Sequence, residues 1–296
     1  MEFATSGVET YWWLPALAAC LISMVTSTAG ISGAFLLLPF QVSVLGFTTP
    51  GVTPTNLLFN VVAIPGGVFR YYREKRMVWP LVWTIAIGTV PGLAAGVFIR
   101  LYYLPDPGLF KMFVGLVLIF IASRLISDII KREEKIRSAN GGNNRFEVTP
   151  LIFNFRRIAY DFNGEKFEVP TPMIFILSAL VGMIGGIYGI GGGAILAPIL
   201  VTLFRLPIHT VSGATLCSTF LTSTMGVLFY VLPSFTDGGS GAMPDWHLGL
   251  MFGVGGAIGI YFGARIQKLL PARLIKAVLG AIMFIISLKY IVGYFS

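Results

Sequence analysis

Apolar stretches long enough to form helices run through nearly the whole of this 296-residue chain, and they carry very little charge. Hydrophobic residues make up 55% of the chain and charged residues 11%, less than half of the roughly 25% charged share of soluble domains. Because a segment that spans lipid must satisfy its main-chain hydrogen bonds internally, such stretches form α-helices. The composition therefore predicts an all-α membrane protein that crosses the bilayer several times.

Ten apolar segments can be delimited, in two groups of five. A polar stretch separates the groups, so the chain divides into a first transmembrane repeat (1–130), a linker (131–170) and a second transmembrane repeat (171–296). The apolar segments lie near 11–29, 31–46, 53–70, 78–100, 109–127, 171–188, 190–205, 210–232, 246–264 and 273–294.

The linker begins with charged and glycine-rich residues and then changes character. Over 151–169, "LIFNFRRIAYDFNGEKFEV", apolar and polar residues alternate on both sides of Asn163 and Gly164. This alternation predicts a β-hairpin with a two-residue turn. We interpret the linker as a small cytoplasmic cap or an ordered connector, and a regulatory or partner-binding role is the alternative.

The two transmembrane groups are copies of one unit. "GISGAFLLLP" at 30–39 aligns without a gap on "GIGGGAILAP" at 189–198, and the same offset continues through the next segment. An insertion in the second copy changes the offset, and the correspondence then resumes. The chain is therefore a tandem duplication. The paired positions include Thr53 and Ser212, Leu57 and Leu216, Gly67 and Gly226, Tyr71 and Tyr230, Trp79 and Trp246, Gly92 and Gly259, Gly96 and Gly263, and Lys111 and Lys276.

Loop charges indicate how the copies sit in the bilayer, because Lys and Arg concentrate in cytoplasmic loops. The loop at 70–76, "RYYREKR", is strongly basic, whereas its counterpart at 233–245 has two acidic residues and no Lys or Arg. The loop around Asp106 has no basic residue, and its counterpart around Lys268 is basic. Equivalent loops thus fall on opposite faces. We expect two inverted repeats, both termini outside the cell membrane, and a cytoplasmic linker.

The predicted fold has about eight to ten transmembrane helices. In each repeat a glycine cluster, at 30–33 and at 189–193, interrupts the first two segments, which we expect to be short or re-entrant. Broken backbone is tolerated at membrane depth only where protein buries it or a wet cavity adjoins it. Inverted repeats with broken segments at matching positions are typical of secondary transporters, whose substrate binds near the midplane between the repeats.

The helix that follows each glycine cluster favours an anion as the substrate. Its first N–H groups lack partners and lie at the positive end of the helix dipole. Glycine allows a ligand to approach these groups closely, which suits a negatively charged one. Close packing of helices at the glycines is the alternative interpretation.

The glycine blocks also carry a family resemblance. Together with "VSGATLCSTFLTSTMGVLFY" at 211–230, they resemble the TauE/SafE family of sulfite and organosulfonate exporters, over nearly the whole chain except the linker. The first block departs from the second by placing Ser32 and Ala34 where the second has Gly191 and Gly193. The resemblance implies export of a small sulfur-containing oxyanion, such as sulfite, sulfoacetate or another organosulfonate.

Small polar side chains follow both glycine clusters. Asn56 and Asn60 are four residues apart, as are Thr215 and Thr219, so each pair shares one face of a helix. Neutral donors suit an anion that already carries its charge, and bonding of the hydroxyls to their own helix is the alternative. The predicted substrate-binding residues are Gly30, Ser32, Gly33, Asn56, Asn60, Gly189, Gly191, Gly192, Gly193, Ser212, Thr215 and Thr219.

The positions of the charged residues limit the mechanism. All thirteen acidic residues lie in loops, termini, the linker or segment ends, so none is placed as a proton relay. We expect export driven by the membrane potential, without a cofactor, a metal or a catalytic residue. Cys20 and Cys217 lie in separate apolar segments and are interpreted as packing residues. The expected partners are the anion and the lipid bilayer, because the basic surplus reports loop orientation rather than nucleic-acid binding.

Other functions remain as alternatives. An anion channel, or a transporter of an anion without sulfur, would use the same N–H groups. An intramembrane serine enzyme is a remote alternative, since Ser32 stands between glycines. No histidine lies mid-segment to serve as its base, and Gly191 replaces the serine in the second copy. We therefore expect a protein that is not an enzyme.

Overall fold

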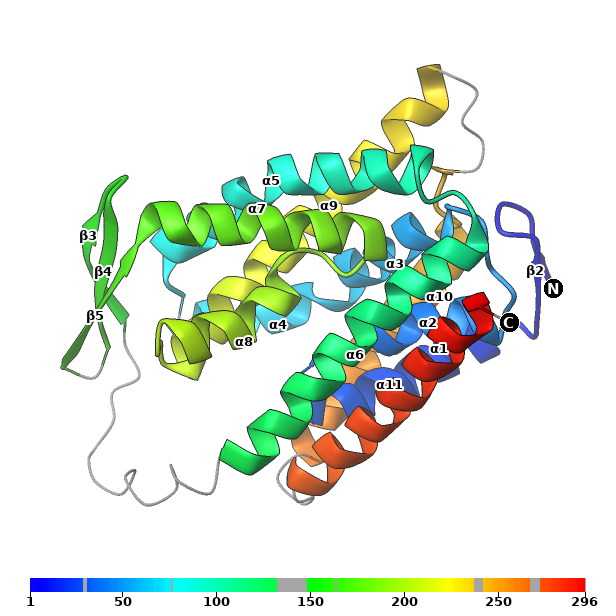
Figure 1. The fold of residues 1–296 in the computed structure, drawn as a ribbon. Helices are drawn as coiled ribbons and strands as arrows, with labels where there is room; N and C mark the ends of the chain where they lie inside the picture. Colours follow the sequence, from blue (N-terminus) through cyan, green and yellow to red (C-terminus); the bar gives the residue numbers. More distant parts are fainter. Residues whose placement is uncertain are drawn as a thin grey trace.

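The computed structural model describes residues 1–28, 31–75, 77–131, 148–162, 164–236, 242–266 and 272–295. Helices dominate this part of the chain (Figure 1). The first group consists of α1 (Leu14–Thr28), α2 (Ala34–Ser43), α3 (Val52–Ala63), α4 (Pro65–Arg73), α5 (Trp79–Tyr102) and α6 (Pro107–Lys131). The second group consists of α7 (Thr171–Tyr188), α8 (Gly193–Leu203), α9 (Ile208–Thr236), α10 (Trp246–Ile266) and α11 (Ala272–Phe295).

The lengths of the helices confirm an all-α fold that crosses a membrane several times. Within the described residues, seven stretches are long and apolar enough to span a bilayer, with α3 and α4 together forming one of them. Three helices, α1, α2 and α8, are shorter, with 15, 10 and 11 residues. An 11-residue helix is only about 16 Å long, roughly half of the hydrocarbon core.

One predicted segment, 53–70, is two helices instead of one. α3 ends at Ala63 and α4 begins at Pro65, which has no N–H to donate to the carbonyl of Val61. The aligned residue of the second repeat is Thr224, and there α9 continues without a break. The break in the first copy therefore coincides with a proline that the second copy lacks.

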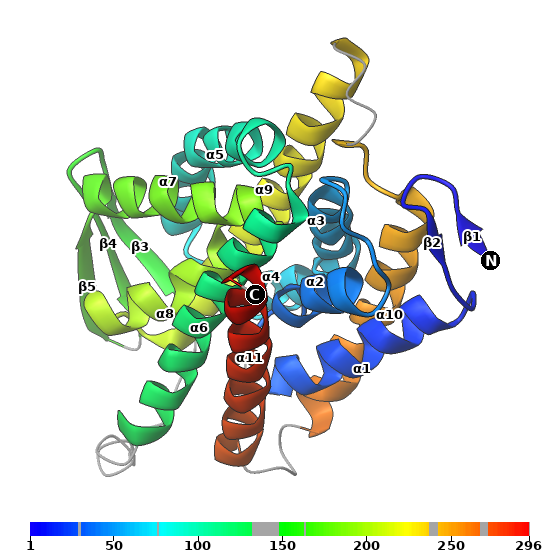
Figure 2. The same ribbon diagram turned by 45° about the vertical axis from the view of Figure 1, so that its right-hand side comes forward.

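The helices pack in pairs that join the two halves of the chain. α7 lies along α5, α1 lies along α10, and α6 lies along α11 (Figures 1 and 2). By the sequence alignment, α1 corresponds to α7 and α10 corresponds to α5. The first helix of each half thus packs on the helix of the fourth apolar segment of the other half.

Glycines at every fourth position allow the first two of these pairs to approach closely. A Cβ built on Gly92 of α5 would lie 1.8 Å from the carbonyl oxygen of Ala179, and one on Gly259 of α10 would lie 2.2 Å from that of Cys20. Such stripes of small residues bring membrane helices into backbone contact.

Cys20 and Cys217 are both free thiols, and Cys217 is buried.

The second part of the linker forms a small antiparallel sheet. β4 (Arg157–Phe162) pairs with β5 (Glu165–Pro170) across Gly164, and β3 (Val148–Phe153) pairs with the other edge of β4. The hydroxyl of Tyr160 in β4 lies 2.9 Å from Oγ1 of Thr210 at the start of α9. Burial raises the pKa of the Tyr160 phenol to about 12. The sheet therefore rests on the helices, at the end of the molecule opposite to both termini (Figure 1).

The N-terminus is fastened to the start of α10. Its two short strands, β1 (Glu2–Phe3) and β2 (Val8–Glu9), flank Ser6, whose N–H and hydroxyl both donate to Oδ2 of Asp245, at 3.1 and 2.7 Å. The other carboxylate oxygen of Asp245 accepts the N–H of Leu248 at 3.0 Å. The buried carboxylate thus caps α10 and holds the N-terminal strands next to the start of that helix.

Candidate functional site

The second glycine cluster interrupts the chain between α7 and α8. α7 ends at Tyr188, and Gly189 and Gly191 take left-handed conformations with φ of +89° and +72°. Residues other than glycine rarely adopt these φ angles, because their Cβ comes too close to the following carbonyl oxygen. The break is buried throughout, and α8 then returns toward the end of the molecule where α7 began (Figure 1). The pair is therefore a helical hairpin.

Side chains of α3 bond to the carbonyl groups at the end of α7 and in the break that follows it, where helical N–H donors are missing. Oγ1 of Thr53 donates to the carbonyl of Ile187 at 3.2 Å. Nδ2 of Asn56 donates to that of Gly189 at 3.0 Å, and Nδ2 of Asn60 donates to that of Ile190 at 3.1 Å. Three polar residues of one helix thus stabilise the broken end of another.

The first glycine cluster lies beside the second. Gly30 is outside the described residues, Ser32 accepts the N–H of Ala34 on its Oγ at 3.3 Å, and α2 begins at Ala34. Nδ2 of Asn56 donates a second bond, of 3.1 Å, to the carbonyl of Ala34, while its Oδ1 accepts Nε2 of Gln41 at 3.1 Å. A single amide therefore bonds to both breaks, and every polar atom of Asn56 has a partner.

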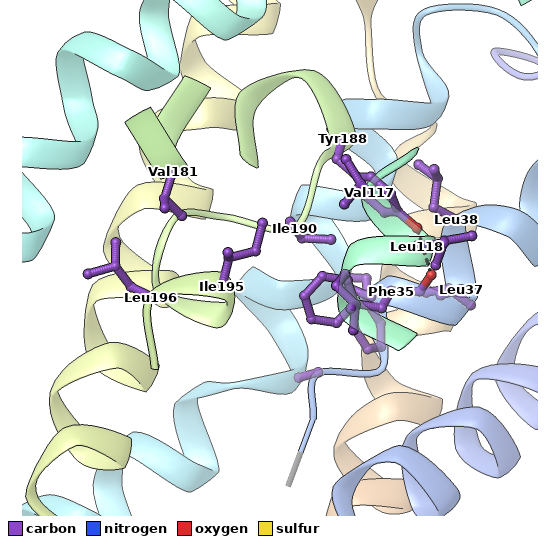
Figure 3. Packing of buried hydrophobic residues seen from close by; sticks show 14 of the residues in the cluster. Phe35, Leu37, Leu38, Val117, Leu118, Val181, Tyr188, Ile190, Ile195 and Leu196 are labelled. Carbon is purple, nitrogen blue, oxygen red and sulfur yellow. Dashed lines mark hydrogen bonds between the residues drawn. The ribbon is translucent and has the colours of Figure 1, made fainter. Parts of the chain in front are cut away.

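A tyrosine forms a second connection between the breaks. Pro39 lies inside α2 and lacks the N–H that would bond to the carbonyl of Phe35. The hydroxyl of Tyr188 donates to this carbonyl instead, at 2.8 Å, and the two rings are in edge contact. Figure 3 shows the two side chains together, with Ile190 beside them. The buried hydroxyl replaces the hydrogen bond that proline removes.

Removal of the Tyr188 hydroxyl should destabilise the protein only while Pro39 is present. In Tyr188→Phe we expect the free energy of unfolding to fall by about 1–3 kcal/mol, because a buried carbonyl loses its donor. In a Pro39→Ala background the new N–H can bond to Phe35, so the same substitution should have a clearly smaller effect. Thermal unfolding of the four variants in detergent measures the difference, and equal losses in both backgrounds would contradict this account.

The hydroxyls of Thr215 and Thr219 in α9 bond to their own helix, whereas Oγ1 of Thr222 accepts the N–H of Gly192 at 3.4 Å. Oγ1 of Thr215 donates to the carbonyl of Val211, and Oγ1 of Thr219 donates to that of Thr215. A Cβ on Gly193 would lie 2.1 Å from the carbonyl oxygen of Thr215, so α8 and α9 are in backbone contact. Ser212 lies one turn before Thr215 and is half-buried.

Two hydroxyls beside the helix starts have no hydrogen-bond partner. Oγ1 of Thr89 in α5 and Oγ of Ser23 in α1 are both buried and unbonded. Each lies 2.7 Å from a Cβ built on a glycine that precedes a helix, Gly192 for α8 and Gly33 for α2. Each helix start therefore has a free hydroxyl next to it.

Arg100 is the buried charged residue that the sequence analysis missed. It lies in the last turn of α5 with no exposed surface. Its Nε donates to Oγ1 of Thr53 at 3.3 Å, its Nη1 donates to the carbonyl of Leu104, and its guanidinium carbon lies 3.7 Å from the centre of the Phe110 ring. In the sequence it is the last residue of the predicted segment 78–100. The signal was its place in the apolar run "VFIRLYYL", since arginine is rare within membrane segments.

The sequence of the chain matches the family model described as Sulfite exporter TauE/SafE over residues 15–290. The chain belongs to the TauE/SafE family. This match covers both repeats and the linker, and it confirms the resemblance carried by the two glycine blocks.

Two relatives that match most of this chain are named as probable membrane transporter proteins. The chain is 23% identical over 280 residues to the probable membrane transporter protein YjnA of Bacillus subtilis, covering 93% of this chain and 98% of that protein. It is also 23% identical over 285 residues to the probable membrane transporter protein MamO of Magnetospirillum gryphiswaldense, covering 90% of this chain but only 44% of that protein. No solved structure matches the chain. The chain is thus a multi-pass protein of a membrane transporter family.

Proposed function

We propose that this TauE/SafE protein exports a small sulfur-containing oxyanion, such as sulfite, sulfoacetate or another organosulfonate, across the cytoplasmic membrane. The anion would bind where the two helix breaks meet and would reach each side in turn as the two repeats rock. Its ligands would be the first N–H groups of α8, with Ser32, Thr215 and Thr219 nearby. Asn56 and Asn60 would hold the breaks in place, because their N–H groups already bond to main-chain carbonyls.

The observation that carries this proposal is the unpartnered hydroxyl beside each helix start. A buried hydroxyl without a partner is unfavourable, so a polar ligand that accepts a hydrogen bond stabilises it. Thr89 and Ser23 occupy this position at α8 and α2. With the positive ends of two helix dipoles next to these hydroxyls, an oxyanion is the ligand that the site favours.

The packing of the helices supports an inverted arrangement of the repeats. Each glycine stripe faces the helix that the alignment assigns to the opposite repeat. The sheet and the basic end of α4 would face the cytoplasm, by the same rule that places Lys and Arg inside. Both termini, with Asp106 and Asp245, would then lie outside, and the linker would belong to the cytoplasmic side.

The membrane potential would drive the export. Moving one negative charge outward releases about 2.3 kcal/mol per 100 mV of inside-negative potential. Among the described residues, no carboxylate lies at the helix breaks to couple transport to protons; the buried Asp245 caps α10 instead.

The test is efflux from proteoliposomes that hold the purified full-length protein. Vesicles loaded with sulfite, sulfoacetate, sulfate or chloride are compared with and without an imposed inside-negative potential. We expect saturable efflux of sulfite or sulfoacetate that accelerates with the potential. Non-saturating chloride flux would indicate a channel. Efflux that requires a proton gradient and does not respond to the potential would contradict the proposal that the membrane potential drives export.

A further inference from the structure

Arg100 carries a positive charge that no described acidic residue balances. The salt bridges among the described residues join Arg70 to Glu74 and Arg157 to Glu168, on the surface. Asp106, the nearest acid along the chain, is exposed and accepts the N–H of Leu109 at the start of α6. A guanidinium keeps its charge in proteins, and a buried charge without a counter-charge is strongly unfavourable.

The side chain also has unused donors. Nη2 of Arg100 is buried and has no hydrogen-bond partner, although Nε and Nη1 are bonded. The aromatic ring of Phe110 and the end of the α7 dipole compensate part of the charge, but neither accepts a hydrogen bond from Nη2. What is missing is an acceptor with a negative charge.

Thr53 connects Arg100 to the broken end of α7. Its Oγ1 accepts the N–H of Arg100 and donates to the carbonyl of Ile187, two residues before Gly189. The phenol of Tyr230 donates to the carbonyl of Gly186, in the last turn of α7, at 2.8 Å. Arg100 therefore lies next to the helix break, on the side of it toward the C-terminal end of α5.

We propose that the guanidinium of Arg100 is the counter-charge of the transported anion, which binds Nη2 on its way between the helix breaks and the side of the molecule that holds the termini. This inference rests on the proposed function and adds a charged site to it. Oxygen atoms of a sulfite or sulfonate group accept paired N–H groups of a guanidinium well, because both are arranged as a fork.

Arg265 provides a matched control. It lies in the last turn of α10, as Arg100 does in α5, but its guanidinium is exposed and stacks on Tyr261 at 4.4 Å from the ring centre. Arg265→Gln removes one positive charge from the last turn of the helix that the alignment pairs with α5, where its side chain contacts Tyr261.

The experiment measures anion affinity in Arg100→Gln, Arg100→Lys and Arg265→Gln. The purified full-length proteins are titrated with sulfite, sulfoacetate, chloride and phosphate while thermal unfolding is followed in detergent, and KM for efflux is measured in proteoliposomes. A ligand that binds only the folded protein raises Tm, by an amount that grows with the logarithm of the ligand concentration divided by Kd. We expect Arg100→Gln to weaken the apparent affinity at least ten-fold, Arg100→Lys to weaken it less, and Arg265→Gln to leave it unchanged.

The outcomes separate this proposal from the proposed function. Wild-type efflux of sulfite with an unchanged KM in Arg100→Gln would overturn the role of Arg100 and leave the function standing. If only chloride or phosphate stabilises the wild type, and Arg100→Gln loses that effect, the counter-charge stands and the sulfur substrate falls. If Arg100→Gln does not fold, Arg100→Lys decides: a raised KM at wild-type Tm supports the proposal, and a lowered Tm with unchanged KM shows a structural role.

Discussion

Addition of one methyl group at position 193 should nearly stop transport. In Gly193→Ala the new Cβ would lie 2.1 Å from the carbonyl oxygen of Thr215 and 2.5 Å from Oγ1 of Thr219. The first of these atoms belongs to the backbone of α9, so the start of α8 must move away from it. Overpacking of this kind destabilises by about 1–3 kcal/mol. Because the first N–H groups of α8 move with it, we expect a fall in efflux of about ten-fold or more.

Two control substitutions separate this effect from the exchange of glycine as such. Gly280→Ala adds a methyl group in the buried part of α11, where the nearest atom is 3.5 Å away. It should leave efflux and Tm unchanged or raise Tm slightly, since alanine favours a helix. Ala34→Gly removes a methyl at the aligned position of the first repeat, which is fully buried. Equal loss of efflux in Gly193→Ala and Gly280→Ala would contradict the argument.

The helices could be predicted from the sequence because the bilayer imposes them. Apolar segments of the length that spans lipid have one local solution, so nine of the ten predicted segments each correspond to one helix. The exception, 53–70, contains Pro65, and the sequence pattern did not show that a helix would end there. β3 adds a third strand to the hairpin around Gly164. The alternation of apolar and polar residues predicted the hairpin but did not indicate that β3 would pair with the free edge of β4.

The candidate site was predicted only in part. The duplication identified matching positions in the two halves. In the structure the described residues of the glycine clusters do lie near Asn56, Asn60, Thr215 and Thr219. The partners of these side chains depend on how α3 packs against α7, which a sequence pattern does not contain. Asparagine N–H groups that an isolated helix would offer to a ligand are used on main-chain carbonyls of the break. The burial of Arg100 was not predicted, because it is the last residue of the predicted segment 78–100.

Removal of the Asn56 side chain should lower stability and maximal efflux rate together. In Asn56→Ala the carbonyl of Gly189 loses its side-chain donor and Nε2 of Gln41 loses its acceptor. The carbonyl of Ala34, the first of α2, loses its bond from outside the helix. Each buried polar group left without a partner costs about 1–3 kcal/mol. Since this amide is bonded to both breaks, the two repeats lose a direct connection. We expect a clear fall in Tm and a fall in maximal rate of about ten-fold or more.

Asn60→Ala is the matched comparison, since Asn60 lies one turn further along α3 and bonds to one break only. It donates to the carbonyl of Ile190 and to Oγ of Ser223, while its Oδ1 has no partner. Its removal should lower Tm and the maximal rate less than Asn56→Ala does. KM separates positioning from direct binding: if Asn56 only holds the breaks, KM for sulfite stays within about three-fold of wild type, which corresponds to less than about 0.7 kcal/mol. A large rise in KM at unchanged Tm would instead show that the amide contacts the anion during transport.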